Sequence, residues 1–158
     1  MKEEVSAGVI LFNELNGKFL LLNYPSKHWD FVKGKMEKGE TPRKTAIRET
    51  SEETGISDIN FLDGFEEEIE YYFYADNQEI HKKVIFFLGK TKTTDVILSH
   101  EHIDYIWLKF DSALEKTTYE NAKKAKKLGS DYLIVGRTIL NSKNPLETTK
   151  HLVTDSIL

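Results

Sequence analysis

The sequence predicts an α/β protein of the α+β kind, in which a mixed β-sheet lies between helices. Strand-like apolar runs occur on both sides of one helix expected over residues 42–54. Helical periodicity then returns after residue 112. With 158 residues, the chain is long enough for a single domain with its own core. We expect this domain to span residues 1–142 and residues 143–158 to form a partly disordered C-terminal tail.

The strands are expected from apolar runs bounded by residues of turn composition. Residues 5–12 and 18–24 are two such runs, and the turn residues between them indicate a hairpin. Asp76-Asn77 separates two later runs in the same way. The later strands are expected over residues 61–74, 83–89 and 105–108. Two C-terminal helices are expected over residues 112–128 and 131–140.

The central helix has recognisable ends. Thr41 is suited to the N-cap, and Pro42 to the first helical turn, where no backbone N–H is needed. Gly55 can adopt the left-handed conformation that often ends a helix. The flank expected to pack on the sheet consists of Ala46, Ile47, Thr50 and Thr54.

Three glutamates project from one side of this helix, because Glu49, Glu52 and Glu53 are spaced i, i+3 and i+4. Their mutual repulsion would destabilise the helix unless a cation neutralised it, and Mg2+ and Mn2+ prefer such oxygen ligands. Arg48 precedes Glu52 by four residues, which is close enough to orient a carboxylate. The alternative is a solvated acidic face, the common arrangement for a glutamate-rich helix.

The spacing of the residues around this helix resembles the Nudix box. The matching positions are Gly34, Glu40, Arg48, Glu49, Glu52, Glu53, Gly55 and Ile56. Thr50 departs from the pattern, at a packing position where the family usually has an aliphatic residue. The resemblance implies an α/β/α sandwich in which the box forms a loop–helix–loop at a metal site. It also implies that Mg2+, or Mn2+ as a substitute, is held by Glu49, Glu52, Glu53 and the Gly34 carbonyl.

Segments outside the box are similar to those of asymmetrical diadenosine tetraphosphate hydrolases of the animal and archaeal kind. The similarity covers residues 5–128 and is carried by Trp29-Asp-Phe-Val-Lys-Gly34, Leu98-Ser-His-Glu-His102 and Tyr105-Ile-Trp-Leu108. It implies that Lys33 and Lys82 contact the polyphosphate, with Lys83 as the alternative to Lys82. It also implies that Tyr71 and Tyr119 place their rings against adenine, an arrangement that base stacking permits. The products implied for diadenosine tetraphosphate are ATP and AMP.

The implied reaction is the attack of a metal-activated water on phosphorus, with cleavage of a phosphoanhydride bond. Glu49, Glu52 and Glu101 are the catalytic carboxylates, and Arg48 orients those of the helix. Glu101 is distant from the box in sequence, as the further carboxylate of many Nudix enzymes is. Any of the three glutamates can be the general base, and Glu40 either supports the loop or binds the metal through water.

Two histidines flank Glu101. In an extended segment, His100 and His102 would share one side and Glu101 would face the other. A zinc site is one interpretation of this pattern. For histidines considered in isolation, we favour a loop or surface position instead.

Composition narrows the classes of function. The formal net charge of −4 argues against a stable nucleic-acid partner, and the absence of cysteine excludes disulfides, thiolate zinc sites and cysteine nucleophiles. No apolar run approaches the length of a membrane span, so we expect no membrane association and a cytoplasmic location. We expect a nucleotide polyphosphate as substrate and leave the oligomeric state open. The alternatives are hydrolysis of RNA 5′ ends or of damaged nucleoside triphosphates, and a non-catalytic domain that senses a nucleotide.

Overall fold

The computed structural model describes residues 1–117. Tyr119, the remainder of the helix expected over residues 112–128, the helix expected over residues 131–140 and the tail 143–158 lie outside the described residues. Within residues 1–117, none of the helices combines the length and the apolar composition of a transmembrane span. Helix α1 covers Pro42–Thr54. A seven-stranded sheet contains β1 (Lys2–Asn13), β2 (Lys18–Asn23), β3 (Trp29–Asp30), β4 (Val32–Lys35), β5 (Asn60–Ala75), β6 (Gln78–Thr91) and β7 (Asp104–Leu108).

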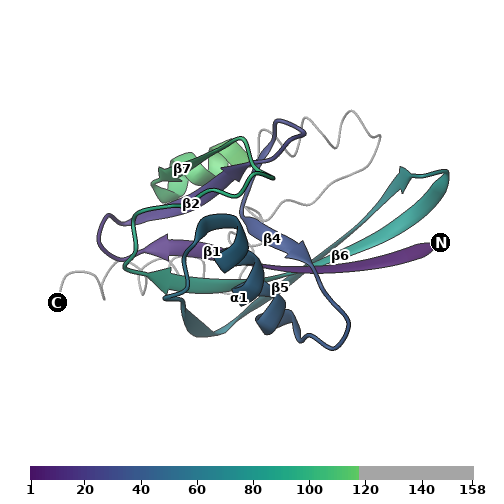
Figure 1. Ribbon diagram of the computed structural model, residues 1–158, viewed down its shortest axis with the longest axis horizontal. Coiled ribbons are helices and arrows are strands. Elements are labelled where there is room, and N and C mark those ends of the chain that lie inside the picture. Colours follow the sequence, from purple (N-terminus) through teal and green to yellow (C-terminus); the bar gives the residue numbers. More distant parts are fainter. Residues whose placement is uncertain (118–158) are drawn as a thin grey trace.

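Strand β1 is the centre of the sheet (Figure 1). It runs parallel to β6 over its full length, from Lys2 opposite Ile80 to Asn13 opposite Thr91. On its other side it pairs antiparallel with β4 and, further along, with β2. Strands β3 and β7 add to β2, and β5 adds to β6. The combination of parallel and antiparallel pairs confirms the predicted mixed sheet.

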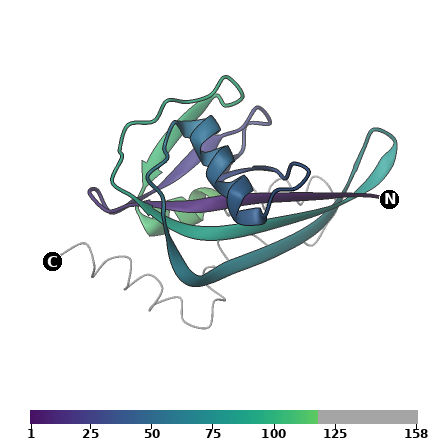
Figure 2. The same ribbon diagram turned by 60° about the horizontal axis from the view of Figure 1, so that its bottom comes forward.

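Helical segments cover both faces of this sheet (Figure 2). Alternate residues of β1 point to opposite faces, as the pleat of a strand requires. Val9 packs on the face that carries α1, in a cluster with Ala46. Phe12 packs on the other face, in a cluster with Ala113 of a helical segment over residues 110–117. The predicted arrangement of a sheet between helices is therefore confirmed.

The ends of α1 are those that the sequence predicts. The Thr41 hydroxyl accepts a hydrogen bond from the Lys44 backbone N–H at 3.3 Å, and Pro42 is the first helical residue. Gly55 follows the last residue with a φ of 72°, in the left-handed region where a residue without a side chain is favoured. Local sequence therefore determines the length of the helix.

The packing flank of α1 differs from the prediction at one position. Thr50 is fully buried, and its hydroxyl donates to the Ala46 carbonyl at 2.7 Å, which satisfies the polar group inside the core. The expected burial of Ile47 is wrong, because its side chain is 42% exposed. The loop after β6 covers the C-terminal turn of α1 instead, where Ile97 N–H donates to the Thr54 carbonyl at 2.9 Å.

The β5–β6 hairpin is longer than predicted and projects beyond the rest of the sheet, next to the N-terminus (Figures 1 and 2). Asp76 and Asn77 form its turn, with φ values of 51° and 59° that a two-residue hairpin turn requires. Tyr71 of β5 lies opposite Lys82 of β6, and Lys82 lies opposite Glu4 of β1. Residues paired in this way share a face, so the hairpin groups these three side chains on the side away from α1.

Candidate active site

The close approach of β4 to α1 forms one side of the site. A Cβ atom at Gly34 would collide with the carboxylate of Glu49. The Glu49 carboxylate therefore occupies the space that a side chain would need, directly against the Gly34 backbone. Burial raises the pKa of Glu49, and the hydrogen bond from Arg48 opposes that effect. Two of the residues that the sequence assigned to the metal thus lie side by side.

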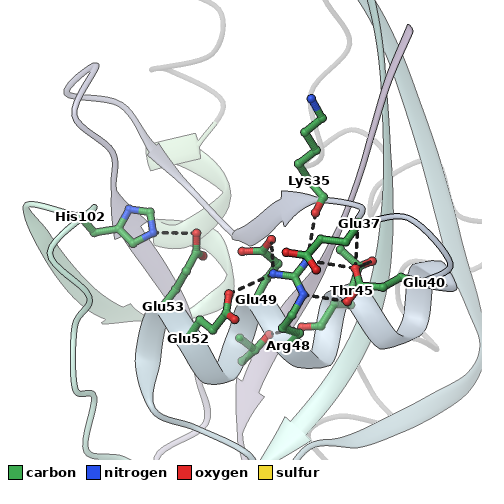
Figure 3. A network of polar contacts seen from close by, with 11 residues as sticks. Lys35, Glu37, Glu40, Thr45, Arg48, Glu49, Glu52, Glu53 and His102 are labelled. Carbon is green, nitrogen blue, oxygen red and sulfur yellow. Dashed lines mark hydrogen bonds and ion pairs between the residues drawn. The ribbon is translucent and has the colours of Figure 1, made fainter.

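Arg48 lies among the carboxylates of the box (Figure 3). Its Nη1 atom donates to Glu49 Oε1 at 2.9 Å and to Glu52 Oε2 at 3.0 Å. Its Nε atom donates to Glu40 Oε1 at 2.7 Å, and its Nη2 atom donates to the Lys35 carbonyl at 3.0 Å. Its bond with Glu40 above all raises the pKa of Arg48 further above its usual value. The permanently charged guanidinium therefore offsets the repulsion among these glutamates.

Glu40 fastens the loop before α1 to the helix. Its Oε2 atom accepts hydrogen bonds from the Thr45 hydroxyl at 2.6 Å and from the Glu37 backbone N–H at 3.0 Å. The bonds from Arg48, Thr45 and Glu37 lower the pKa of Glu40 to about 2. Of the two roles expected for Glu40, these contacts fit the support of the loop.

Glu53 turns away from Arg48 and towards His102 (Figure 3). Its Oε1 atom lies 2.9 Å from His102 Nε2, and both side chains are almost fully buried. Its Oε2 atom is also buried and has no hydrogen-bond partner within residues 1–117. Of the loop or surface position favoured for His102, the loop is confirmed and the surface is wrong: the residue lies outside helix and strand, but its ring is buried and packs edge-on against Tyr24, with ring centroids 4.6 Å apart. His100 is exposed, as expected.

The segment around Glu101 is a turn and not an extended strand. The His102 N–H donates to the Ser99 carbonyl at 3.3 Å, and this bond closes the turn. The two histidines consequently do not share one side, because the alternation of a strand does not apply. The Ser99 N–H donates to the Glu53 carbonyl at 3.1 Å, which attaches the turn to the C-terminal end of α1. Glu101 is exposed in this turn, next to the buried contact of Glu53.

The lysines expected to contact phosphate lie within electrostatic range of each other. Lys33 Nζ is 4.1 Å from the centroid of the Tyr24 ring. Lys82 Nζ is 3.4 Å from Glu4 Oε2. Burial lowers the pKa of Lys82, and the positive charges of Lys33 and Lys35 lower it further. Neither Glu4 nor Lys35 was singled out from the sequence, since neither lies in a pattern that marks a ligand site.

The structure distinguishes Lys82 from its neighbour. Lys83 points to the opposite face of the sheet, where its Nζ atom is 3.0 Å from Glu68 Oε1 in an exposed ion pair. Tyr71 lies on the face of Lys82 and packs against the core cluster there. Burial, more than any charge, raises the pKa of Tyr71 to about 12. The hairpin therefore places Tyr71 beside Lys82 and separates Lys83 from both.

Tyr24 was not predicted as a site residue, although it lies between His102, which contacts Glu53, and Lys33. Its hydroxyl donates to the Phe31 carbonyl at 2.8 Å. Its ring contacts both the His102 imidazole and the Lys33 ammonium group. Burial, and then the negative charge of Glu53, raise the pKa of Tyr24 well above its usual value. No local signal marks this residue, because its partners come from several separate segments.

The profile of the NUDIX domain family matches residues 2–128 of the chain. The chain belongs to the Nudix family. Its Nudix relatives include the asymmetrical bis(5′-nucleosyl)-tetraphosphatase of Sus scrofa, 36% identical over 122 residues that cover 73% of this chain and 80% of that protein. A dihydroneopterin triphosphate diphosphatase of Haemophilus influenzae is 31% identical over 136 residues, which cover 78% and 85% of the two chains. The crystal structure of a C. elegans Ap4A hydrolase binary complex has a TM-score of 0.64 and 30% identity, over 78% of this chain and 93% of that one.

Nudix hydrolases typically use a divalent metal, so we ask whether the glutamates of the box could bind such a cation. Within residues 1–117, no three His, Cys, Asp or Glu side chains are already grouped to hold a metal. Glu49 and Glu52 face Arg48, and Glu53 faces His102. The residues nevertheless fit a hard cation, because all are oxygen donors and Glu53 Oε2 is buried without a partner. A cation bound at this helix would be coordinated by carboxylate oxygens that now contact Arg48 and His102.

Proposed function

We propose that this Nudix hydrolase cleaves dinucleoside tetraphosphates asymmetrically and converts diadenosine tetraphosphate into ATP and AMP. The observation that carries the proposal is the grouping of Tyr71 and Lys82 on one face of the sheet, within electrostatic range of Lys33 next to the box. An aromatic ring beside several ammonium groups suits a ligand that combines a base with a long phosphate chain. The similarity to an asymmetrical tetraphosphatase over 73% of the chain supports the same substrate class.

The proposed metal ligands are Glu49, Glu52, Glu53 and the Gly34 carbonyl, which would hold Mg2+ or, in its place, Mn2+. When bound, the cation lowers the pKa of the attacking water and offsets negative charge on the phosphate oxygens. Arg48 remains protonated and holds Glu49 and Glu52 relative to the loop. The close fit of the Glu49 carboxylate against Gly34 keeps that carboxylate at the site even without a cation.

In the proposed reaction, the water oxygen forms a bond to phosphorus, a phosphoanhydride P–O bond breaks, and one nucleotide leaves with the bonding electrons. A carboxylate accepts the proton of the water, and Glu49, Glu52 and Glu101 are the three groups proposed for this step. Partial burial raises the pKa of Glu49, and the direction of this shift favours Glu49 as the proton acceptor. Glu101 is exposed in the turn that is attached to the end of α1.

The proposed substrate contacts lie on the face of the sheet away from α1. Lys33 and Lys82 would bind the phosphate chain as point charges, and Tyr71 would stack against adenine. Tyr119 stays a prediction for a second aromatic contact and lies outside the described residues.

A substrate panel tests the proposal. Diadenosine tetraphosphate, ATP, an oxidised nucleoside triphosphate, dihydroneopterin triphosphate and a 5′-triphosphate RNA are compared by kcat/KM with Mg2+, and the products are identified by chromatography. We expect the highest kcat/KM for diadenosine tetraphosphate, with ATP and AMP released in equal amounts. A higher value for any triphosphate, or ADP as the product, would overturn the proposal.

E53Q is the control for the panel. The amide retains an oxygen and can still contact His102, so the fold should persist, but one ligand charge is lost. Turnover should fall by two orders of magnitude or more on the substrate that the wild-type protein prefers, roughly the effect of removing a metal-binding carboxylate. If the wild-type protein binds these nucleotides and hydrolyses none, the non-catalytic sensing domain is supported instead.

The alternative substrates are RNA 5′ ends and damaged nucleoside triphosphates. The similarity to a triphosphate diphosphatase of Haemophilus influenzae, at 31% identity, favours a triphosphate as the second candidate. In that case pyrophosphate would be a product, which the same chromatography detects.

A further inference from the structure

Glu4 of β1 is surrounded by lysines from three strands. Its Oε1 atom lies 2.9 Å from Lys2 Nζ and 3.4 Å from Lys35 Nζ. Its Oε2 atom lies 3.4 Å from Lys82 Nζ. Lys2 above all, with Lys82 and Lys35, lowers the pKa of Glu4 to about 2. The carboxylate is therefore fully ionised at neutral pH. We call Glu4, Lys2, Lys35 and Lys82 the N-terminal charge cluster.

The N-terminal charge cluster has more positive than negative charge. One carboxylate faces three ammonium groups. The charge of Lys33 also reaches Lys82, but Lys33 is itself paired with Asp30, its Nζ atom lying 3.1 Å from Asp30 Oδ2. The side chains of Glu4 and Lys82 are only 15% and 14% exposed, so water screens this part of the cluster incompletely. Lys2 and Lys35 are more exposed, at 44% and 59%. A group of three cations with a single anion among them, one of the cations being partly desolvated, is suited to a ligand that carries several negative charges.

The cluster lies next to the box. The carbonyl of Lys35 accepts the hydrogen bond from Arg48 at 3.0 Å, whereas its side chain extends away from the glutamates (Figure 3). On the other side of the cluster, Lys82 lies opposite Tyr71 in the β5–β6 hairpin. Lys35 and Lys82 thus connect the box to the strand that carries the proposed adenine contact.

Glu4 holds two of these lysines loosely. Its distances to Lys35 and Lys82 are both 3.4 Å, longer than the roughly 2.7–2.9 Å of a tight charge-assisted hydrogen bond. The phosphate oxygens of a ligand can replace the carboxylate at both ammonium groups, so the partly buried ammonium group of Lys82 is not left unpaired. The closer contact with Lys2, at 2.9 Å, gives the displaced carboxylate a partner that it can keep.

We propose that Glu4 competes with the phosphate chain of the substrate for Lys35 and Lys82. In the free protein, Glu4 neutralises the cations that the phosphate chain binds; on binding, phosphate oxygens take its place; on product release, Glu4 returns. Glu4 therefore lowers the affinity of the site for polyphosphates and shortens the time that products stay bound. The inference rests on the proposed function for the identity of the ligand, but a binding experiment tests it without any turnover.

Calorimetric titration of inorganic tripolyphosphate, without metal and at neutral pH, is the test. E4Q keeps the size of the side chain and removes its charge. We expect E4Q to bind tripolyphosphate roughly 3- to 10-fold more tightly than the wild-type protein, as the loss of a competing ion pair would give. The matched control is E3Q, which removes the same charge one residue away, from a side chain that is 74% exposed. E3Q should change the affinity less than two-fold.

Unchanged or weaker binding by E4Q would overturn the inference and show that Glu4 holds the lysines in place for the ligand. Equal gains in E4Q and E3Q would also overturn it, because the effect would then be one of net charge. The outcome is independent of the substrate panel: if diadenosine tetraphosphate is a poor substrate but E4Q binds tripolyphosphate more tightly, the proposed function fails and the role of Glu4 stands. Melting temperatures of both variants confirm that folded protein is compared.

Discussion

His102 is the residue through which the turn after β6 reaches the glutamates of the helix. Its ring lies between Tyr24 and Glu53, and its Nε2 atom is 2.9 Å from Glu53 Oε1. The contact is a close approach without hydrogen-bond geometry, because within residues 1–117 neither ring nitrogen of His102 has a hydrogen-bond partner, and Glu53 Oε2 has none either. We therefore infer that His102 positions Glu53, as residues that contact a metal-binding side chain commonly fix its orientation.

Replacing His102 should weaken metal binding. We expect H102A to lower the affinity for Mn2+ by roughly 10- to 100-fold, the usual cost of removing a group that orients a metal ligand. H102Q, whose amide can still reach Glu53, should recover part of this loss. The measurement is the free Mn2+ signal in electron paramagnetic resonance, titrated without substrate.

The matched control for this prediction is H100A, since His100 is exposed and lies two residues away in the same turn. H100A should bind Mn2+ as the wild-type protein does. Equal affinities for H102A and H100A, in proteins with the same circular dichroism spectrum, would contradict the positioning role.

At the scale of elements, the loop before α1 depends on the ionisation of Glu40. The folded protein lowers the pKa of Glu40 from its usual 4.5 to about 2, so folding favours the ionised form. The stabilising effect is complete above about pH 4.5 and is lost as the pH falls towards 2. Below that range both folded and unfolded chains carry a protonated Glu40, and the effect is gone.

E40Q should accordingly lower the free energy of unfolding at neutral pH, and its difference from the wild-type protein should shrink as the pH falls from 4.5 towards 2. Urea unfolding at several pH values across this range measures the difference. E37Q is the control, because Glu37 contributes its backbone N–H to the same contact and is exposed. A difference that stays constant with pH would argue against the ionised bonds of Glu40.

The β5–β6 hairpin is the element that should determine affinity for the base. Y71A should raise KM for diadenosine tetraphosphate by roughly 5- to 100-fold, from the usual energy of stacking a base on an aromatic side chain. It should change the hydrolysis of a minimal polyphosphate much less, because that substrate has no base. Steady-state kinetics on the two substrates gives the comparison.

Y72A is the matched control for this prediction. Tyr72 is the next residue of β5, points to the opposite face and is 53% exposed, with its ring stacked on His81 at a centroid distance of 4.6 Å. It should leave both KM values near those of the wild-type protein. Equal effects of Y71A on the two substrates would remove the stacking role of Tyr71.

Across the whole molecule, the sequence was sufficient to predict those features that depend on residues close together in the chain, such as the ends of α1. The cap at Thr41 and the left-handed Gly55 determine where α1 begins and ends. The helical spacing of Arg48 and Glu52 brings their side chains together, as the distance of 3.0 Å shows. The apolar runs predicted the positions of five strands, although not their full length, whereas the short strands β3 and β4 were not predicted.

The features that depend on distant segments could not be predicted in this way. Glu4 meets Lys82 because β1 and β6 pair in parallel, and nothing near either residue encodes that register. His102 is buried because its turn attaches to the end of α1. The alternation of side chains expected for an extended segment around Glu101 therefore did not predict its position. The exposure of Ile47 likewise depends on where the loop after β6 runs.

The parallel pairing of β1 with β6 also orders events during synthesis. Lys82 is 78 residues from Glu4, an interval of roughly 4–16 s at the ~5–20 residues per second of translation. In that time β1 can already pair with β2 and β4, and α1 with its box glutamates can form beside them. The N-terminal charge cluster cannot form, because Lys82 has not yet been made. A nascent chain therefore carries the carboxylates of the box before it contains all of the lysines proposed to bind the phosphate chain. The proposed polyphosphate site is complete only after β6 has paired with β1.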